Sequence, residues 1–255
     1  MPVVLTDVDD RGVMTITLAD EERRNALSAE LTSELGAAFD TADADPSVRV
    51  VVLTNTGTTF CAGANLKERS DDASAPPAAV RNPADLFGHI RRSPKPYVGR
   101  LAGHCIAGGL GLAASCDISV AKDDAVFGFT EVRIGVAPAV ISVVCLPKMR
   151  PGEARAAFLR GNRFHAPEAA RLGLINAAVA ADELDTAVNE IVGDLLHGAP
   201  GALAAAKQLL DRVPAMDIDD AFAWTAQLSA ELFASDEARE GMSAYLEKRT
   251  PPWVP

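Results

Sequence analysis

The order of strand-like and helix-like segments constrains the fold of this chain more than any other feature of its 255 residues. Over roughly the first 180 residues, short apolar runs with strand patterns alternate with segments of helical periodicity. Beyond that point, residues 183–247 carry helical patterns only. Alternating strands and helices pack as layers around one core, so the first part predicts an α/β fold. The helical remainder has no sheet of its own and must bury its apolar stripes on that core or on another subunit.

Local signals mark several of these segments. The run VRVVVL at 48–53 is almost wholly β-branched and apolar, which is typical of a strand that is buried on both faces. Ser28 suits the N-cap of a helix whose apolar residues recur from Leu31 to Phe39. Ser235 is expected to divide the last helical stretch, 218–247. Further strands are expected at 13–18, 96–101, 117–121 and 177–179, and further helices at 85–92, 140–148, 151–160, 167–172, 183–196 and 202–213.

Composition excludes several classes of function. Asp and Glu outnumber Lys and Arg by 35 to 24, a net charge of −11, so the chain lacks the basic surface that nucleic acid requires. No uncharged apolar run reaches the ~18 residues of a membrane span, and residues 1–10 show no secretory signal. The cysteines form no CxxC pair and the histidines show no ligand spacing, so neither a disulfide framework nor a metal site is expected. These features together predict a reduced, cytoplasmic protein.

Two segments of small residues could bring backbone N–H groups close to a ligand: 61–65 (CAGAN) and 107–111 (AGGLG). The second leads into a helix, whose first N–H groups have no partner within the helix. Two such N–H groups directed at one point form an oxyanion hole. The alternative is that small residues only allow close packing of helix and sheet. Gly109, Gly111 and Ala114 also match a dinucleotide-binding fingerprint, but they do not lie in a first βα turn, so NAD binding is not expected.

A single carboxylate, Glu131, lies in the mostly apolar run 127–135 (FGFTEVRIG). Partial desolvation there would raise its pKa toward the range that is useful for proton transfer. The alternative is a surface glutamate that pairs with Arg133 or another base. Cys61 and Cys105, close to the Gly-rich segments, have no neighbouring base and are expected to be small core residues rather than nucleophiles.

Taken together, these segments resemble the crotonase superfamily, that is, the enoyl-CoA hydratase/isomerase family. The pieces that carry the resemblance cover nearly the whole chain: 24–27 (RNAL), 60–66 (FCAGANL), 103–109 (GHCIAGG), 116–117 (CD), 127–135 and 245–249 (YLEKR). The resemblance implies an α/β fold of stacked ββα turns with two nearly perpendicular sheets, residues 1–198, which binds the acyl-CoA. Residues 199–255 would form a helical region that closes the CoA site and mediates homotrimers or dimers of trimers.

The resemblance also implies a chemistry and a set of site residues. The substrate is the CoA thioester of an unsaturated fatty-acyl or branched-chain acid, with no separate cofactor and no metal. The N–H groups of Ala64 and Gly108 would hold the thioester oxygen as an enolate forms, and Glu131 would act as general acid/base. Residues expected to contact the substrate are Arg24, Ala26, Ala62, Ala64, Asn65, Leu66, Lys67, Gly108, Gly109, Pro138 and Lys248, and Arg249 is a further candidate for a phosphate contact.

Three departures from the family's pattern bear on the reaction. Gly111 occupies the position where hydratases of the family carry a second glutamate, Asn65 replaces a frequent aspartate, and 135–142 replaces a glycine-rich stretch. The overall resemblance favours hydration of a 2-enoyl-CoA to a 3-hydroxyacyl-CoA. Isomerisation of a 3-enoyl- to a 2-enoyl-CoA needs one carboxylate only and is the alternative. A non-catalytic acyl-CoA-binding member and another reaction of the superfamily, such as decarboxylation or thioester hydrolysis, stay open.

The segment 70–83 is rich in Asp, Ala, Ser and Pro. This composition predicts a surface segment that is the most mobile internal stretch of the chain. Protection of the segment from protease by an acyl-CoA would indicate that it orders over the substrate.

Overall fold

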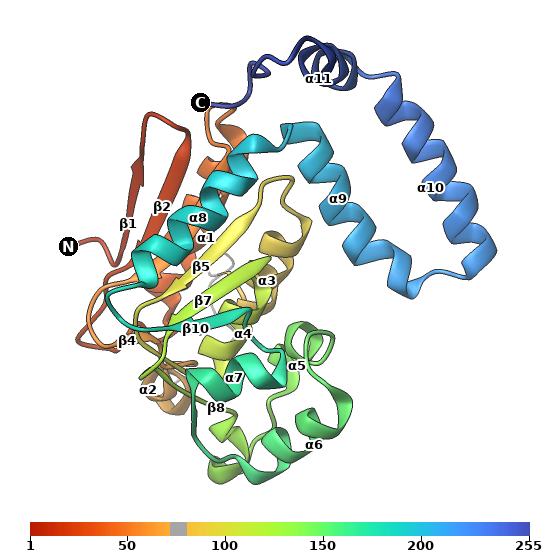
Figure 1. Ribbon diagram of the computed structural model, residues 1–255. Helices are drawn as coiled ribbons and strands as arrows, with labels where there is room; N and C mark the ends of the chain where they lie inside the picture. Colours follow the sequence, from red (N-terminus) through yellow and green to blue (C-terminus); the bar gives the residue numbers. More distant parts are fainter. Residues whose placement is uncertain (72–80) are drawn as a thin grey trace.

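Two β-sheets organise the N-terminal and central parts of the chain (Figure 1). In the computed structural model, which describes residues 1–71 and 81–255, the larger sheet has six strands in the order β1-β2-β3-β5-β7-β10. β1 and β2 are antiparallel, and the remaining neighbours are parallel. The strands are β1 (Val4–Val8), β2 (Val13–Leu18), β3 (Val50–Asn55), β5 (Tyr97–Leu101), β7 (Ile118–Lys122) and β10 (Ala177–Val179).

The smaller sheet contains β4 (Thr59–Cys61), β6 (His104–Ile106), β8 (Val126–Gly128) and β9 (Phe164–His165), in that order. β4, β6 and β8 are parallel neighbours, and β9 is antiparallel to β8. The chain passes repeatedly from the larger sheet to the smaller one and then into helical structure: from β3 to β4, from β5 to β6, and from β7 to β8. This repetition confirms the predicted ββα architecture.

The helices begin at signals that the sequence carries. α1 (Ala29–Ala44) is capped by Ser28, whose Oγ accepts from the N–H of Leu31 at 3.1 Å. Ser235 caps α11 (Asp236–Glu247) in the same way and separates it from α10 (Ile218–Phe233), as predicted. The structure further contains α2 (Leu66–Asp71), α3 (Pro83–Arg92), α4 (Gly108–Ser115), α5 (Ala139–Cys145), α6 (Pro151–Arg160), α7 (Ala166–Leu172), α8 (Leu184–His197), α9 (Pro200–Arg212) and the 3₁₀ turns η1 (Thr130–Ile134) and η2 (Val213–Ala215).

Two apolar clusters cover the two faces of the larger sheet. Successive residues of a strand point to opposite faces, so β3 contributes to both clusters. Val51 and Leu53 pack in the larger cluster with α1, α3 and α4, whereas Val50 and Val52 pack in the smaller one with α8. Figure 1 shows α8 lying along the sheet. This burial on both faces explains why the run 48–53 is almost continuously apolar.

Some predicted boundaries differ from the observed ones because pairing with neighbouring strands decides them. The strand predicted at 48–53 is observed at 50–55, where its pairing with β2 runs to Asn55. The small-residue segment 61–65 begins with Cys61, the last residue of β4, which is held in place by pairing with β6. Such short strands have too few residues to show a periodic pattern in sequence.

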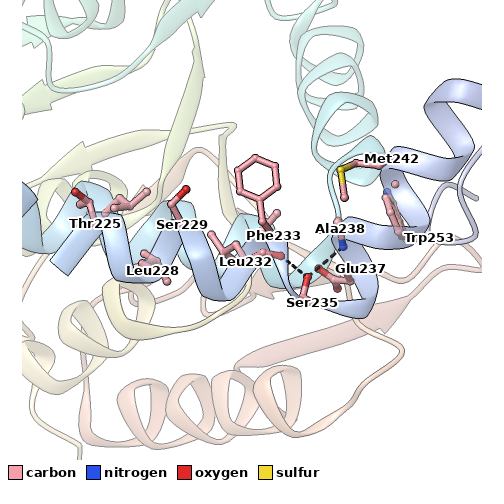
Figure 2. A pocket seen from close by; sticks show the side chains of 14 residues that line it. Thr225, Leu228, Ser229, Leu232, Phe233, Ser235, Glu237, Ala238, Met242 and Trp253 are labelled. Carbon is pink, nitrogen blue, oxygen red and sulfur yellow. Dashed lines mark hydrogen bonds between the residues drawn. The ribbon is translucent and has the colours of Figure 1, made fainter. Parts of the chain in front are cut away.

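α9, α10, α11 and the tail to Pro255 form a C-terminal arm that projects from the core (Figure 1). α9 is tied to the core by Lys207, whose Nζ donates to the carbonyl oxygens of Ile90 at 3.0 Å and Lys95 at 2.8 Å and to the carboxylate of Asp117 at 2.8 Å. By contrast, α10 buries none of its residues. An open, apolar pocket of about 530 Å³ lies between the helices of the arm (Figure 2).

Two features are absent from residues 1–71 and 81–255. No helix there has the length and apolarity needed to cross a membrane. No group of three or more His, Cys, Asp and Glu side chains there could hold a metal ion. The segment 70–83 lies largely outside the described residues, which omit 72–80, so the expectation for that segment stays a prediction.

Candidate active site

Three segments that follow neighbouring strands of the smaller sheet meet at one edge. β4, β6 and β8 are parallel and adjacent, so their carboxyl ends lie side by side. β4 leads into Ala62, β6 leads into Ala107, and β8 leads into η1, which contains Glu131. The N–H of Ala107 donates to the carbonyl oxygen of Gly128 at 3.0 Å and joins the last two segments. The fold thus brings both Gly-rich segments and Glu131 to the edge of a parallel sheet where ligands commonly bind.

Residues 24–27 run beside the first Gly-rich segment. Leu27 forms a parallel bridge with Ala64, and its N–H donates to the carbonyl oxygen of Gly63 at 2.8 Å. The N–H of Ala62 donates to the carbonyl oxygen of Arg24 at 3.1 Å. The pieces RNAL and CAGAN are therefore one continuous wall of the site.

Asn25 holds this wall in shape, a role that the sequence did not reveal. It is fully buried and has a φ of 51°, in the left-handed region that asparagine tolerates. Its Oδ1 accepts from the N–H of Asp20 and its Nδ2 donates to the carbonyl oxygen of Thr59, both at 2.7 Å. One side chain thus fixes the loop before Ala26 to the strand that leads into Ala62. A lone asparagine in a charged loop has no periodic pattern, so only the fold exposes its function.

The two Gly-rich segments touch at Gly63 and Gly108. Gly63 has a φ of 86°, and a Cβ placed there would lie 2.8 Å from the nitrogen of Gly108. A Cβ on Gly108 would lie 3.6 Å from the nitrogen of Ala64. Within the described parts of the chain, the N–H groups of Ala64 and Gly108 donate to no protein acceptor. Two adjoining N–H groups without partners are what an oxyanion requires.

Ala107 orients the second donor through a strained backbone. It precedes α4 with φ 50° and ψ −120°, a combination that only glycine adopts readily. Its own N–H is held by Gly128, so the next peptide unit, which carries the N–H of Gly108, is turned away from the strand. Strain of this kind costs about 1–3 kcal/mol and is retained where surrounding contacts hold it.

Replacing Ala107 with glycine is expected to raise the thermal unfolding midpoint by about 2 °C or more, because relief of the strain exceeds the ~0.5–1 kcal/mol entropy cost of glycine. Differential scanning calorimetry measures the change. Ala113→Gly, inside the same helix, is the control and should lower the midpoint. An equal fall in both variants would show that Ala107 is not strained.

Two glycines of α4 have a packing role. A Cβ on Gly109 would lie 2.1 Å from the carbonyl oxygen of Cys61, so Gly109 permits the close approach of α4 to β4. Gly109 is buried, and its substrate contact stays a prediction. A Cβ on Gly111 would lie 2.5 Å from Cγ2 of Ile141 and 2.9 Å from the ring of Phe87. The side-chain space at position 111 is therefore already filled by apolar groups.

Glu131 is half-buried and has one carboxylate oxygen without a partner. Its Oε2 is buried and has no hydrogen-bond partner among the described residues. Burial raises the pKa of the Glu131 carboxyl above its ordinary value of 4.5. The alternative in which Arg133 neutralises this carboxylate is not what the structure contains, since no ion pair in residues 1–71 and 81–255 joins the two. A partly desolvated carboxylate with one oxygen free of partners is suited to accept and return a proton.

The raised pKa of Glu131 gives an expected pH dependence with a definite sign. If the carboxylate form is the base, kcat/KM should fall as the pH drops through a pKa above the ordinary 4.5. The free energy of unfolding should change in the opposite direction. It should fall as the pH rises from 4.5 through the folded-state pKa, because burial disfavours the charged carboxylate. Glu131→Gln should therefore unfold at a higher temperature than wild type near neutral pH and at the same temperature below 4.5. An equal difference at both pH values would contradict the assigned cause.

The remaining expected contact residues near this edge differ in exposure. Arg24 is exposed, and its guanidinium has no hydrogen-bond or ion-pair partner among the described residues, whereas Ala26 is buried. Leu66 and Lys67 lie exposed at the start of α2. Asn65 precedes them, and its Oδ1 accepts from the N–H of Lys67 at 3.2 Å, so it supports the start of α2. Pro138 is buried in front of α5.

Lys248 is not brought to this edge by its own chain. It ends α11 with a φ of 56°, and Figure 1 shows α11 far from α2 and β4. Arg249 pairs with Glu240 and Glu247, so its charge is already balanced. In one chain, therefore, neither residue reaches the site with which the sequence associated it.

The buried thiols and His104 have structural surroundings. Cys61 and Cys105 are fully buried, and burial raises the pKa of Cys61 to about 12, which leaves its thiol protonated at neutral pH. Nδ1 of His104 accepts from the N–H of Val126 at 3.0 Å. The burial of the two cysteines agrees with the core role expected from the sequence, and His104 has a local hydrogen bond.

Known proteins match this chain over nearly its whole length. Residues 9–254 match the family described as "Enoyl-CoA hydratase/isomerase". Mevalonyl-coenzyme A hydratase of Aspergillus fumigatus is 33% identical over 248 residues, 95% of this chain and 92% of that protein. Carnitinyl-CoA dehydratase of Escherichia coli is 31% identical over 250 residues, 95% of each. The crystal structure of enoyl-CoA hydratase from Mycobacterium smegmatis gives a TM-score of 0.91 at 34% identity, with 99% of both chains covered.

These matches run through nearly the whole chain in sequence and in three dimensions, so the two sheets and their helices have the crotonase fold. The chain belongs to the enoyl-CoA hydratase/isomerase family and is an enzyme of that family.

Proposed function

We propose that the enzyme adds water to a 2-enoyl-CoA to form a 3-hydroxyacyl-CoA, and catalyses the reverse reaction. The observation that carries the proposal is the placement of two partnerless N–H groups, on Ala64 and Gly108, and of the half-buried Glu131, whose Oε2 has no partner among the described residues, at the ends of adjacent strands. The N–H groups suit a thioester oxygen that becomes negative, and the carboxylate suits proton transfer beside it.

Each group has a defined part in the proposed reaction. Glu131 takes a proton from water as the water oxygen bonds to C3 of the acyl chain. The C2–C3 π electrons move toward the thioester, and the resulting enolate oxygen is held by the N–H groups of Ala64 and Gly108. Protonated Glu131 then gives its proton to C2, and the thioester carbonyl re-forms. Each oxyanion donor is expected to supply about 10²–10³ in rate, and the acid/base about 10²–10⁴.

The names of the relatives support water as the second reactant. Mevalonyl-coenzyme A hydratase and carnitinyl-CoA dehydratase are both named for addition or removal of water at an acyl-CoA. The acyl group of the substrate here is proposed to be an unsaturated fatty-acyl or branched-chain group. Arg24, with its exposed and partnerless guanidinium, is proposed to meet a phosphate of CoA.

Isomerisation of a 3-enoyl- to a 2-enoyl-CoA is the second candidate, and the packing at Gly111 favours it. Ile141 and Phe87 fill the space that a side chain at position 111 would need, so no second carboxylate can act from there. One carboxylate is enough for isomerisation: Glu131 would take a proton from C2 and return it to C4. The same N–H groups would hold the dienolate between the two steps.

The assembly is proposed to be a homotrimer or a dimer of trimers. The absence of buried residues in α10 supports this, because a helix with exposed Ile218, Phe222 and Phe233 gains stability by covering them with another copy. Residues 1–198 would then be the catalytic core and 199–255 the assembling region. Lys248 would reach the CoA site of a neighbouring subunit.

A paired assay separates the two candidate reactions. One cuvette holds a short 2-enoyl-CoA and the other a 3-enoyl-CoA, and the absorbance of the conjugated thioester is followed in both. Loss of absorbance in the first supports hydration, and gain in the second without change in the first supports isomerisation. A Glu131→Gln preparation serves as the blank. No change in either cuvette contradicts both reactions and leaves acyl-CoA binding without turnover, or another reaction of the superfamily.

A further inference from the structure

The two ends of the C-terminal arm meet at one side chain, Arg49. Arg49 precedes β3, and its guanidinium donates to the carbonyl oxygen of Trp253 at 2.5 Å and to that of Gly198 at 2.9 Å. Gly198 directly precedes the arm, and Trp253 lies at its end. The indole N–H of Trp253 also donates to the carbonyl oxygen of His197 at 3.1 Å. One cation of the core thus binds the entry and the exit of the arm together.

A second contact closes the arm on itself. The carboxylate of Glu237, in the first turn of α11, accepts from the N–H of Gly201 at 3.0 Å with both oxygens, at the start of α9. The charge of Glu237 also faces Arg49 and opposes the effect of burial on the pKa of its guanidinium. Hydrogen bonds of Arg49 and Glu237 therefore hold together the start of α9, the start of α11 and the tail, and the two side chains carry opposite charges.

An open apolar pocket lies beside this junction. Its volume is about 530 Å³, and it lies in the angle of the three helices, lined by Leu228, Leu232, Met242 and Trp253 among others (Figure 2). Covering apolar walls of this kind is favourable by about 25 cal/mol per Å², so a free α11 would gain by moving inward. α9 cannot follow such a movement, because Lys207 and Asp211 fix it to the core. The contacts of Arg49 tie the tail to the entry of the arm, away from such an inward position.

We propose that Arg49 is a positioning residue that holds the C-terminal arm open, so that α10 and Lys248 are presented to a neighbouring copy of the chain. The proposal rests on the assembly given under Proposed function. It assigns a role in assembly and CoA affinity to a side chain that directly precedes β3 and contacts both ends of the arm.

Arg49→Met and Arg49→Lys test the proposal, with Arg239→Met as the matched control. Methionine keeps the length of the stem but removes every donor, and lysine retains a charge that can reach one carbonyl. Arg239 is an exposed arginine of α11 that pairs with Asp236 within the same helix, so its loss removes a charge from the arm but no link to the core. Mass by sedimentation, amide hydrogen exchange and steady-state kinetics are measured for all three.

Arg49→Met is expected to weaken assembly about tenfold or more, the effect of losing hydrogen bonds to a charged group. Amide exchange should rise in residues 236–255 and stay unchanged in α9. At a protein concentration where wild type is assembled, KM for a short 2-enoyl-CoA should rise about tenfold with kcat altered less than about twofold. Arg49→Lys should lie between wild type and Arg49→Met, and Arg239→Met should match wild type.

Wild-type assembly and wild-type exchange in folded Arg49→Met would overturn the proposal. If that variant does not fold, Trp253→Phe replaces it, because phenylalanine keeps a ring beside the pocket but cannot donate to His197. Unchanged mass and tail exchange in both Arg49→Lys and Trp253→Phe would equally overturn it. Mass and exchange need no turnover, so an inactive wild type would count against the proposed reaction and not against the role of Arg49.

Discussion

Replacing Glu131 with glutamine is expected to lower kcat by about 10³-fold or more, while the Kd of a saturated acyl-CoA changes less than about threefold. The amide has nearly the same size as the carboxylate but cannot take a proton from water or carbon. No ion pair is broken, since Glu131 has a buried Oε2 without a partner. The loss should therefore appear in chemistry and not in binding or folding.

Stopped-flow or steady-state absorbance gives kcat, and calorimetric titration with a saturated acyl-CoA gives the Kd. Glu153→Gln is the matched control, because Glu153 is an exposed carboxylate of α6 that pairs with Arg171. Its substitution should leave both quantities unchanged. Retention of more than a tenth of wild-type turnover by Glu131→Gln, or loss of binding with residual turnover, would remove the assigned role.

The sequence predicts this site well where the signal is local. Ser28 and Ser235 cap helices as expected, and the two Gly-rich segments do meet. The buried carboxylate in an apolar run was also anticipated, because the residues around Glu131 are themselves apolar. Composition and spacing suffice for such features, since a cap, a glycine loop and a desolvated side chain depend on residues that are close in sequence.

Features that depend on distant partners were not predictable. Asn25 acquires its role from Asp20 and from Thr59, which a different ββα turn supplies. Gly109 has a packing role that its own segment does not show, because it faces the carbonyl of Cys61 across the junction of α4 and β4. The separation of Lys248 from the site follows from how the arm is anchored at its ends. Each outcome is set by register and packing between elements, which no single segment encodes.

Replacing Gly63 with alanine is expected to lower kcat/KM by about 10²–10³, the effect of losing one oxyanion-hole donor. The new Cβ would lie 2.8 Å from the nitrogen of Gly108 and 3.0 Å from the carbonyl oxygen of Ile106, and both are backbone atoms that cannot rotate away. Position 63 also has a φ of 86°, where alanine is strained. The backbone must shift at the point where the two Gly-rich segments touch, so the N–H of Gly108 moves away from the oxyanion.

The matched control is Gly152→Ala, because a Cβ at Gly152 meets no atom within 4 Å. This variant should keep wild-type kcat/KM and should not lose stability. Gly63→Ala is expected to lose stability as well as activity, so kcat is compared at a temperature where circular dichroism shows both variants to be folded. An unchanged kcat/KM in folded Gly63→Ala would mean that the donors tolerate displacement, and the oxyanion would then have to be held elsewhere. Loss of kcat with nearly unchanged acyl-CoA affinity would instead place the contribution of Gly108 in the transition state, because a donor that binds ground state and transition state equally alters KM and leaves kcat unchanged.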